Sequence, residues 1–317
     1  MLTGTLPAVA PSVGNGVAGV LKKFTLCLIL TLSVSARGAT TIDSNHQYSY
    51  GANIGWMNWL ADGSADGVSI GEFICSGWIY GANVGWINFG NGNPFNHIQY
   101  NNNSATDFGV NYGIDPMQPG YGILRGYAYG ANIGWINFEA IGNPRINLTT
   151  GGLSGYAYSA NCGWINLNDM SGNYIQTDHI AMGVDSNNNG IADAWEYLYF
   201  GGLLAPGQEN SLSPNGNGMT LLQDYLDGTD PTQAGGGLRI TAYSSNSDGS
   251  SSHITFTSSG GRLYAIEVNS DIRQPLNWTD SGLGSFVPDA GTTTTRNVTQ
   301  TSASKRFFRV KTMRPLP

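Results

Sequence analysis

The sequence predicts a mainly β protein: a repeat β array at residues 40–180, a short loop–helix segment at 181–236 and a β-sandwich at 237–317. Three observations lead to this prediction. A nine-residue phrase occurs four times, charged residues make up only 11% of the chain, and 45 glycines accompany abundant Asn, Ser and Thr. Phrases that recur about every 29–30 residues are typical of repeat architectures. Eight Trp and sixteen Tyr residues supply apolar area for a folded core.

The first 36 residues are expected to be a signal peptide. Lys22 and Lys23 precede an apolar run at residues 24–32, and small residues at 34–36 suit cleavage. The run is too short to cross a bilayer as a permanent helix. We therefore expect a secreted or cell-surface protein whose mature chain has no integral membrane segment.

The charge distribution argues against nucleic acid as the main partner. Residues 40–180 carry nine acidic and two basic residues, and residues 181–236 carry seven acidic and no basic residue. Only from residue 237 onward do nine basic residues outnumber five acidic ones. An acidic body with a basic tail would repel a phosphate backbone over most of its surface.

The repeated phrase has the form Tyr-Gly-Ala-Asn-Ile-Gly-Trp-Ile-Asn. Its four copies share an opening Tyr and a later Trp, which are Tyr50 and Trp56, Tyr80 and Trp86, Tyr129 and Trp135, and Tyr158 and Trp164. In the third copy, residues 124–129 alternate as a strand, Asn and Gly give a turn, and residues 135–138 form the return strand. A third strand is expected at residues 145–148. Residues 91–122 contain extra chain and are expected to form a loop on one face.

Three strands per repeat favour a stacked, solenoid-like β array. In a continuous antiparallel meander, an odd strand number would reverse each successive unit and place identical phrases in unlike surroundings. A prism or a sandwich is the alternative arrangement.

The repeated Tyr and Trp side chains are interpreted mainly as packed core. The alternative is a sugar-stacking surface, because carbohydrate-binding modules combine aromatic and Asn side chains. The turn asparagines share the fourth position of the phrase and are expected to hydrogen-bond to turn backbone or to one another; they are Asn53, Asn83, Asn132 and Asn161. Cys75 and Cys162 occupy apolar positions of the unit, so no disulfide between them is expected.

Residues 48–167 resemble a repeat of secreted bacterial proteins with the pattern Gly-Tyr-Ala-Trp-x-x-Asn-x-Gly-Trp-Ile-Asn-Phe. Tyr129 and Tyr158 stand where that repeat more often has Trp. The resemblance implies export and brings no known activity.

The acidic segment contains a match to a calcium-binding loop. The expected ligands are oxygen donors at the spacing of such loops, namely Asp185, Asn187, Asn189, the Ile191 carbonyl, Asp193 and Glu196. Gly190 permits the sharp turn, and a helix is expected over residues 191–200. The alternative is an Asn-rich turn that caps this helix without metal.

A second loop repeats the pattern 28 residues later. Its expected ligands are Ser213, Asn215, Asn217, the Met219 carbonyl and Asp224. Ser213 replaces the usual Asp, and Asp224 is shorter than Glu, so the sequence leaves its metal binding open. The pair of loops resembles the calcium segments of dockerins and thrombospondin type 3 repeats. This resemblance implies a Ca²⁺-dependent stiffening of the chain between domains.

Residues 237–317 contain six strand-like runs separated by Ser, Asp and Gly turns, which predicts a small β-sandwich. The runs are residues 238–243, 253–257, 263–268, 285–287, 293–299 and 307–311. The region resembles the terminal β domain that follows calcium segments in secreted proteins, and this implies a surface or sorting role.

No catalytic motif stands out in the sequence. The four histidines lack the spacing of metal ligands, and neither a nucleophile elbow nor a phosphate-binding loop is present. We therefore expect a non-enzymatic structural or adhesive protein of the cell surface or extracellular matrix. Its expected partners are copies of itself, in a fibre or surface layer, or an extracellular polysaccharide. The alternatives are a carbohydrate-binding module that uses the repeat aromatics, or an accessory subunit of a secreted glycan-degrading system.

Overall fold

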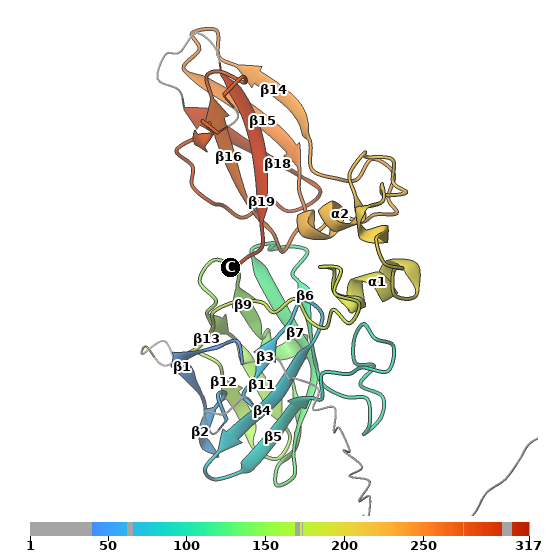
Figure 1. Cartoon of the computed structure of the whole chain (residues 1–317). Coiled ribbons are helices and arrows are strands. Elements are labelled where there is room, and N and C mark those ends of the chain that lie inside the picture. Colours follow the sequence, from blue (N-terminus) through green and yellow to red (C-terminus); the bar gives the residue numbers. More distant parts are fainter. Residues whose placement is uncertain are drawn as a thin grey trace, which may run out of the picture. The chain divides into compact units, whose positions relative to one another are not determined.

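A computed structural model describes residues 40–61, 66–168, 172, 174–274, 276–299 and 306–316. The expected signal peptide lies outside these residues. The described chain is mainly β, with antiparallel sheets and two short α-helices, so the predicted class is confirmed (Figure 1). Among the described residues, no helix is long and apolar enough to cross a membrane.

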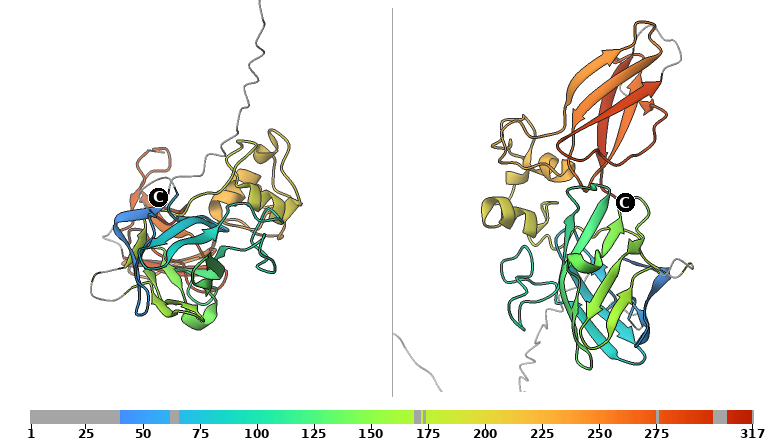
Figure 2. Two further views of the ribbon diagram at one scale, coloured as in Figure 1. Left: turned by 90° about the horizontal axis from the view of Figure 1, so that it is seen from below. Right: turned by 180° about the vertical axis from the view of Figure 1, so that it is seen from behind.

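The four repeats form a closed antiparallel barrel of eight strands. Each repeat contributes one hairpin, and the strands are β1 (Ile42–Gly51), β2 (Gly55–Asn58), β4 (Cys75–Gly81), β5 (Gly85–Gly90), β7 (Tyr121–Gly130), β8 (Gly134–Asn137), β11 (Tyr156–Ser159) and β12 (Gly163–Asn166). Each hairpin pairs with the next one, and β12 of the last repeat pairs with β1 of the first (Figures 1 and 2).

The register is the same in all four repeats. The opening Tyr of each phrase lies opposite the Trp of its own hairpin, as Tyr50 does opposite Trp56. On its other side, this Tyr pairs with the Asn that ends the preceding phrase, as Tyr80 does with Asn58. The last phrase closes the ring in the same way, because Asn166 pairs with Tyr50.

This ring differs from the stacked array that the sequence suggested. Each repeat places two strands in the barrel, and its remaining strands pair outside the ring; these are β3 (Ser69–Ile70), β6 (Val110–Ile114), β9 (Arg145–Asn147), β10 (Leu153–Ser154) and β13 (Ile175–Thr177). An even number of barrel strands preserves the direction of each unit. Identical phrases therefore occupy equivalent places without stacking.

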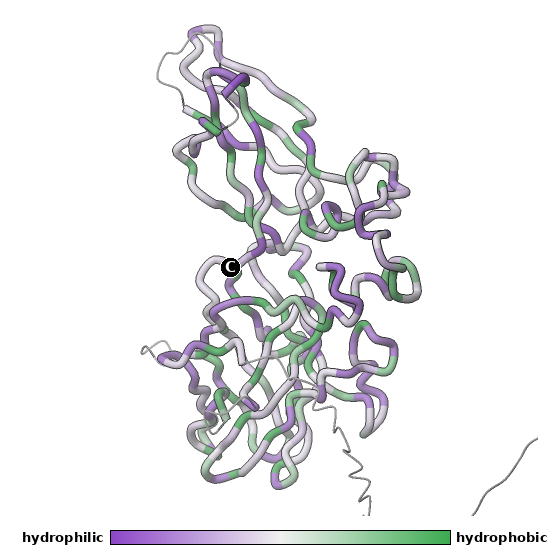
Figure 3. The backbone as a smooth tube through the Cα atoms, viewed as in Figure 1, coloured by the Kyte–Doolittle hydropathy of each residue, from purple (hydrophilic) through white to green (hydrophobic). Residues whose placement is uncertain are grey.

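Side chains fill the barrel in layers to which each repeat gives one residue. Three layers, all 6% exposed or less, are Ile54, Val84, Ile133 and Cys162; Met57, Ile87, Ile136 and Ile165; and Trp59, Phe89, Phe138 and Leu167. The ring centroids of Trp59 and Phe89, and those of Phe89 and Phe138, lie 5.0 Å apart. The interior is a packed core, as expected for eight strands. Alternation of apolar and polar residues is visible along the strands in Figure 3.

The turn asparagines link neighbouring repeats at one end of the barrel. Each donates its side-chain N–H to a backbone carbonyl in the turn of the preceding repeat, at 3.0–3.1 Å, and the acceptors of Asn53, Asn83, Asn132 and Asn161 are Cys162, Ile54, Val84 and Ile133. The glycine after each acceptor has a positive φ, 78° at Gly55 for example. The expected bond to turn backbone is confirmed, with its acceptor in the preceding unit around the ring.

The loop–helix segment contains α1 (Asp193–Phe200), the 3-10 helix η2 (Gln208–Asn210) and α2 (Leu221–Asp227). The two α-helices pack together, with the rings of Trp195 and Tyr225 5.6 Å apart. Thr220 and Gln223 form a capping box at the start of α2. Glycines in the left-handed conformation end both helices.

The C-terminal region consists of two three-stranded antiparallel sheets that share a core. One sheet contains β14 (Ile240–Ser245), β15 (Ser251–Thr257) and β18 (Thr293–Thr299), and the other contains β16 (Leu263–Asn269), β17 (Thr279–Asp280) and β19 (Phe307–Met313). Their shared core includes Phe256, Tyr264 and Ile266. The run expected at residues 285–287 makes a bridge from Phe286 to Tyr264, and the short β17 pairs with β16 further along, at Glu267 and Val268.

Candidate functional site

The repeated aromatic side chains lie on the outer wall of the barrel. The four Trp side chains, Trp56, Trp86, Trp135 and Trp164, are 43–47% exposed, and Tyr50, Tyr80, Tyr129 and Tyr158 are 38–40% exposed. Their interpretation as packed core is therefore wrong. The neighbouring residue in each return strand, such as Met57 after Trp56, fills the core instead, because successive side chains in a strand point to opposite faces.

Each Trp lies between two aromatic rings of the paired strand. The centroid of the opening Tyr is 4.9–5.1 Å from that of its Trp. A second aromatic ring, two residues earlier, lies 6.0–6.4 Å away, and these are Tyr48, Trp78, Tyr127 and Tyr156. Together the twelve side chains form what we call the aromatic girdle. It presents one three-ring cluster per repeat at the outer wall.

The third cluster differs because the insertion between the second and third repeats lies against it. Phe108, from the insertion, approaches Trp135 at a centroid distance of 5.0 Å with the ring planes at 87°. The two side chains border a pocket of about 460 Å³ whose other lining residues are Asn102, Asn103, Ser104, Ala105 and Tyr127. This volume is in the range of small-molecule sites.

Hydrogen bonds within the insertion, and one buried bond to β4, hold it in place. Asp107 is 2% exposed, and its carboxylate accepts two bonds from Asn101, one from the backbone and one from the side chain. Asn102 accepts a bond from the backbone N–H of Gly109. The buried Tyr100 donates its hydroxyl to the Cys75 carbonyl at 3.1 Å. The pocket wall is therefore ordered before any ligand arrives.

The first loop of the acidic segment surrounds a buried carboxylate. Glu196 is 0% exposed, and its oxygens accept bonds from the side-chain amides of Asn187 and Asn189 at 2.6–3.3 Å. The Leu204 backbone N–H also donates to it. The Asn187 Oδ1 atom is buried and has no hydrogen-bond partner. An orphaned oxygen beside a buried carboxylate fits a site for a hard cation.

The remaining side chains expected as ligands of this loop bond to its backbone. Asp185 accepts the N–H groups of Asn189 and Gly190, and Asp193 accepts that of Ser186. Within the described residues, no group of three His, Cys, Asp or Glu side chains is placed to hold a metal ion. The loop therefore brings Asn187, Asn189 and Glu196 together. A metal site here would combine the carboxylates of the loop with amide oxygens and with the Ile191 carbonyl.

The second loop has nearly the same arrangement. Asp224 is 0% exposed and accepts bonds from the side-chain amides of Asn215 and Asn217 at 3.0 and 2.7 Å. Met219, at the carbonyl position, donates its N–H to Asn217 Oδ1. Ser213 differs from its counterpart Asp185, because its hydroxyl donates to the Pro231 carbonyl.

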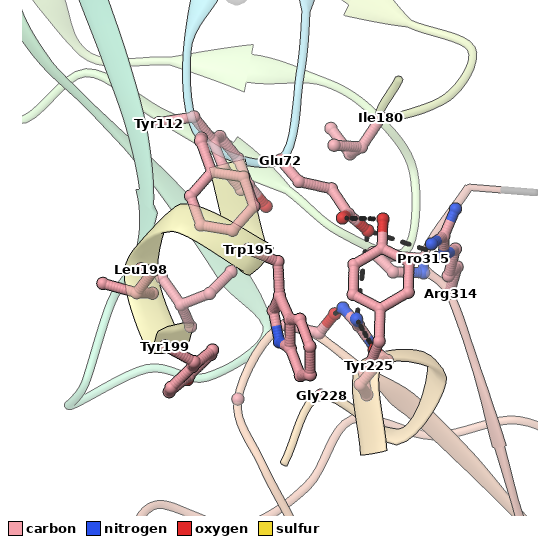
Figure 4. Close-up of a pocket in the computed structure, with 15 residues that line it drawn as sticks. Glu72, Tyr112, Ile180, Trp195, Leu198, Tyr199, Tyr225, Gly228, Arg314 and Pro315 are labelled. Atoms are coloured by element: carbon pink, nitrogen blue, oxygen red, sulfur yellow. Dashed lines mark hydrogen bonds and ion pairs between the residues drawn. The ribbon is translucent and has the colours of Figure 1, made fainter. Parts of the chain in front are cut away.

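A junction around Glu72 joins the barrel to the later part of the chain. Tyr225, on α2, donates its hydroxyl to Glu72 at 2.8 Å, while Arg314 and Arg262 lie 3.5 and 3.9 Å from the same carboxylate (Figure 4). They border a cavity of about 150 Å³ that also contacts Trp195. Burial and the Glu72 charge raise the pKa of Tyr225, so its hydroxyl remains a donor.

Asp227, at the end of α2 near this junction, has a raised pKa. Burial, and next the charge of Asp224, raises the pKa of Asp227 to about 6. Its Oδ2 atom is buried without a hydrogen-bond partner. The side chain therefore favours the protonated state more than an exposed Asp does.

Sequence reasoning missed the junction and the role of Phe108. The only sequence signal for the pocket is the 49-residue spacing between Trp86 and Trp135, against 30 and 29 for the other pairs. Comparison with protein-family models, curated proteins and solved structures finds no match for this chain.

Proposed function

We propose that this chain is an exported, non-catalytic adhesive protein whose barrel binds polysaccharide through the aromatic girdle, with a segment stabilised by Ca²⁺ beside it. The observation that carries the proposal is the girdle itself. Four equivalent Trp side chains, each 43–47% exposed, present ring surface at the wall of a barrel whose core is already filled. Exposed aromatic surface of this extent is typical of interaction sites.

A purely structural role accounts for only part of the girdle. Cross-strand Tyr–Trp pairs stabilise hairpins by roughly 0.5–1.5 kcal/mol each. The exposed parts of the rings add nothing to this contact. Their apolar area and the neighbouring amides suit the apolar face and the hydroxyl groups of a sugar.

The ring closure weighs against fibres built from the repeats. End-to-end growth of stacked coils requires unpaired strand edges. Each of the eight described barrel strands has a hydrogen-bonded neighbour on both sides. The polysaccharide therefore takes precedence over a second copy of the chain as partner.

The Ca²⁺ part of the proposal rests on the first loop. Asn187, Asn189 and Glu196 would hold the ion, with Asp185, Asp193 and the Ile191 carbonyl as the other ligands of the sequence pattern. The residues 181–236 carry seven acidic and no basic side chain, so a bound cation would relieve their repulsion. A site of this composition suits the weak affinities of extracellular calcium modules.

Affinity electrophoresis tests the adhesive function. The chain without residues 1–36 should be retarded in gels that contain a neutral polysaccharide, and simultaneous replacement of the four girdle Trp residues by Ala should abolish the retardation. Circular dichroism of this variant checks that the barrel still folds. Release of reducing sugar by the wild-type chain, abolished by a single carboxylate substitution, would contradict a non-catalytic role.

A further inference from the structure

The four clusters of the aromatic girdle are equivalent in register but not in surroundings. We propose that the third cluster, around Trp135, is the principal binding site and accommodates a sugar unit of a neutral polysaccharide. This inference rests on the proposed function and adds to it the location of the site and the class of its ligand.

The pocket at Trp135 combines aromatic rings with polar side chains. Phe108 stands nearly perpendicular to the indole, at 87°. Asn103 and Ser104 line the same pocket from the exposed part of the insertion. A sugar ring that stacks on Trp135 would thus have hydrogen-bonding groups at its edge, which is the usual composition of a ligand site.

The wall of this pocket is preorganised. Asp107 and Asn102 fix the internal fold of the insertion through bonds with Asn101 and Gly109. Tyr100 links the insertion to β4 through its bond to the Cys75 carbonyl. The backbone of the insertion also approaches β7 closely, because a Cβ atom at Gly126 would lie 2.4 Å from the Gly109 carbonyl. A wall that is already ordered lowers the entropic cost of binding. The insertion therefore adds binding groups to the third cluster, and little entropy should be lost in ordering them when a ligand binds.

The charges favour a neutral ligand. None of the seven residues that line the pocket is Asp, Glu, Lys, Arg or His. The surrounding residues 40–180 carry nine acidic and two basic residues, and this excess would repel uronic acids or sulfated sugars.

The other three clusters provide matched controls. The chain between the second and third Trp residues is about 19 residues longer than between the first and second, since the spacings are 49 and 30. Each Trp nevertheless makes the same cross-strand contact with its Tyr, at 4.9–5.1 Å. Replacement of Trp56, Trp86 or Trp164 should therefore cost similar stability, and Trp135→Ala loses the contact with Phe108 in addition. Only replacement of Trp135 should remove the proposed main site.

The experiment compares four single variants in gels that contain mixed-linkage β-glucan, galactomannan, dextran or carboxymethylcellulose. Trp135→Ala should weaken binding to the retarding neutral polymer by about tenfold, as loss of a central contact does. Trp56→Ala, Trp86→Ala and Trp164→Ala should each weaken it by less than about threefold. Melting temperatures should fall most in Trp135→Ala, which also loses the Phe108 contact, and all four variants should remain folded at the temperature of the gels, which separates binding from folding.

A second pair of variants changes residues of the insertion and leaves the barrel strands unaltered. Asn103→Ala removes an exposed amide of the pocket and should weaken binding by about threefold. Asn93→Ala removes an exposed amide of the same insertion outside the pocket and should have no effect.

The outcomes distinguish this inference from the proposed function. Equal losses of binding in all four Trp variants would overturn the third site and leave the girdle as a distributed binding surface. Retardation by none of the polymers would overturn both. Stronger retardation by carboxymethylcellulose than by the neutral polymers would overturn the neutral ligand. Self-association in sedimentation velocity that Trp135→Ala abolishes would identify a second copy of the chain as the occupant and overturn the sugar site.

Discussion

The two loops of the acidic segment differ in sequence more than in geometry. The first has a carboxylate at the first, ninth and twelfth positions, whereas the second has Ser213, Leu221 and Asp224 there. In the structure, each loop nevertheless surrounds a fully buried carboxylate with two Asn side chains. Both have a glycine with positive φ at the sixth position, 83° at Gly190 and 80° at Gly218.

The comparison separates the shape of a metal loop from its charge. Asn and Gly residues set the backbone of both loops, because they tolerate left-handed conformations and bond to nearby N–H groups. The second loop retains this backbone with one ligand carboxylate instead of three. We therefore expect that charge, rather than shape, separates their affinities for Ca²⁺.

The largest expected effect is that of Ca²⁺ itself on stability. At a concentration 100 times the dissociation constant of one site, binding adds about 2.7 kcal/mol to the free energy of unfolding. Calcium should therefore raise the melting temperature of the chain, and a chelator should restore protease cleavage within residues 181–236. Isothermal titration calorimetry without heat of binding at millimolar Ca²⁺ would remove both loops as metal sites.

Single substitutions at the twelfth position should separate the loops. Glu196→Gln should weaken Ca²⁺ binding by about tenfold or more, because it removes one charge from the complete ligand set. Asp224→Asn should have a much smaller effect on the total binding isotherm. Calorimetry of both variants measures this difference, and the reverse order of effects would show that the second loop is the main site.

A negative charge added to the second loop should bring its Ca²⁺ affinity closer to that of the first loop. Ser213→Asp supplies the missing carboxylate at the first position, so Ca²⁺ affinity at this loop should rise by several-fold. The substitution also removes the bond from the Ser213 hydroxyl to the Pro231 carbonyl. Ser213→Ala loses the same bond without the charge and serves as the control for stability.

The smallest effect is expected at Asp227. This residue follows the second loop at the position where Tyr199 follows the first loop, 28 residues earlier. Because the pKa of Asp227 is raised to about 6, the folded state holds this proton more tightly than the unfolded state does. The resulting stabilisation is present below about pH 4 and is lost as the pH rises through 6. Asp227→Asn should flatten this part of the stability profile, measured by urea unfolding with chelator present. An unchanged profile would contradict the assignment.

Local patterns in the sequence predicted much of the fold. Turn residues and alternation located the hairpins, and the apolar positions of Ile191, Trp195 and Tyr225 located the helical core. Leu198, three residues after the buried Trp195, is apolar but 49% exposed. The helix begins at Asp193 and has only about two turns, so fewer of its side chains reach the core.

Alternation alone could not tell the inside of the barrel from the outside. In the repeated phrase both faces of the strand are apolar, with Tyr and Trp on one and Ile or Met on the other. The side with Ile and Met fills the interior together with the layer that contains Trp59, Phe89 and Phe138. Eight strands then leave no room for eight additional large rings. The pocket at Trp135 was equally hidden, since it depends on where the insertion lies in space.

The closing contact of the ring also determines when the barrel can be completed. Asn53 of the first repeat bonds to the Cys162 carbonyl, 109 residues later in the chain. During synthesis, β1 is therefore paired with β2 alone until the fourth phrase has been made. Until then, the other edge of β1 stays unpaired. Such long-range closure slows folding. A chain that ended between residues 137 and 156 would lack β11 and β12 and would leave an open sheet with unpaired edges at β1 and β8.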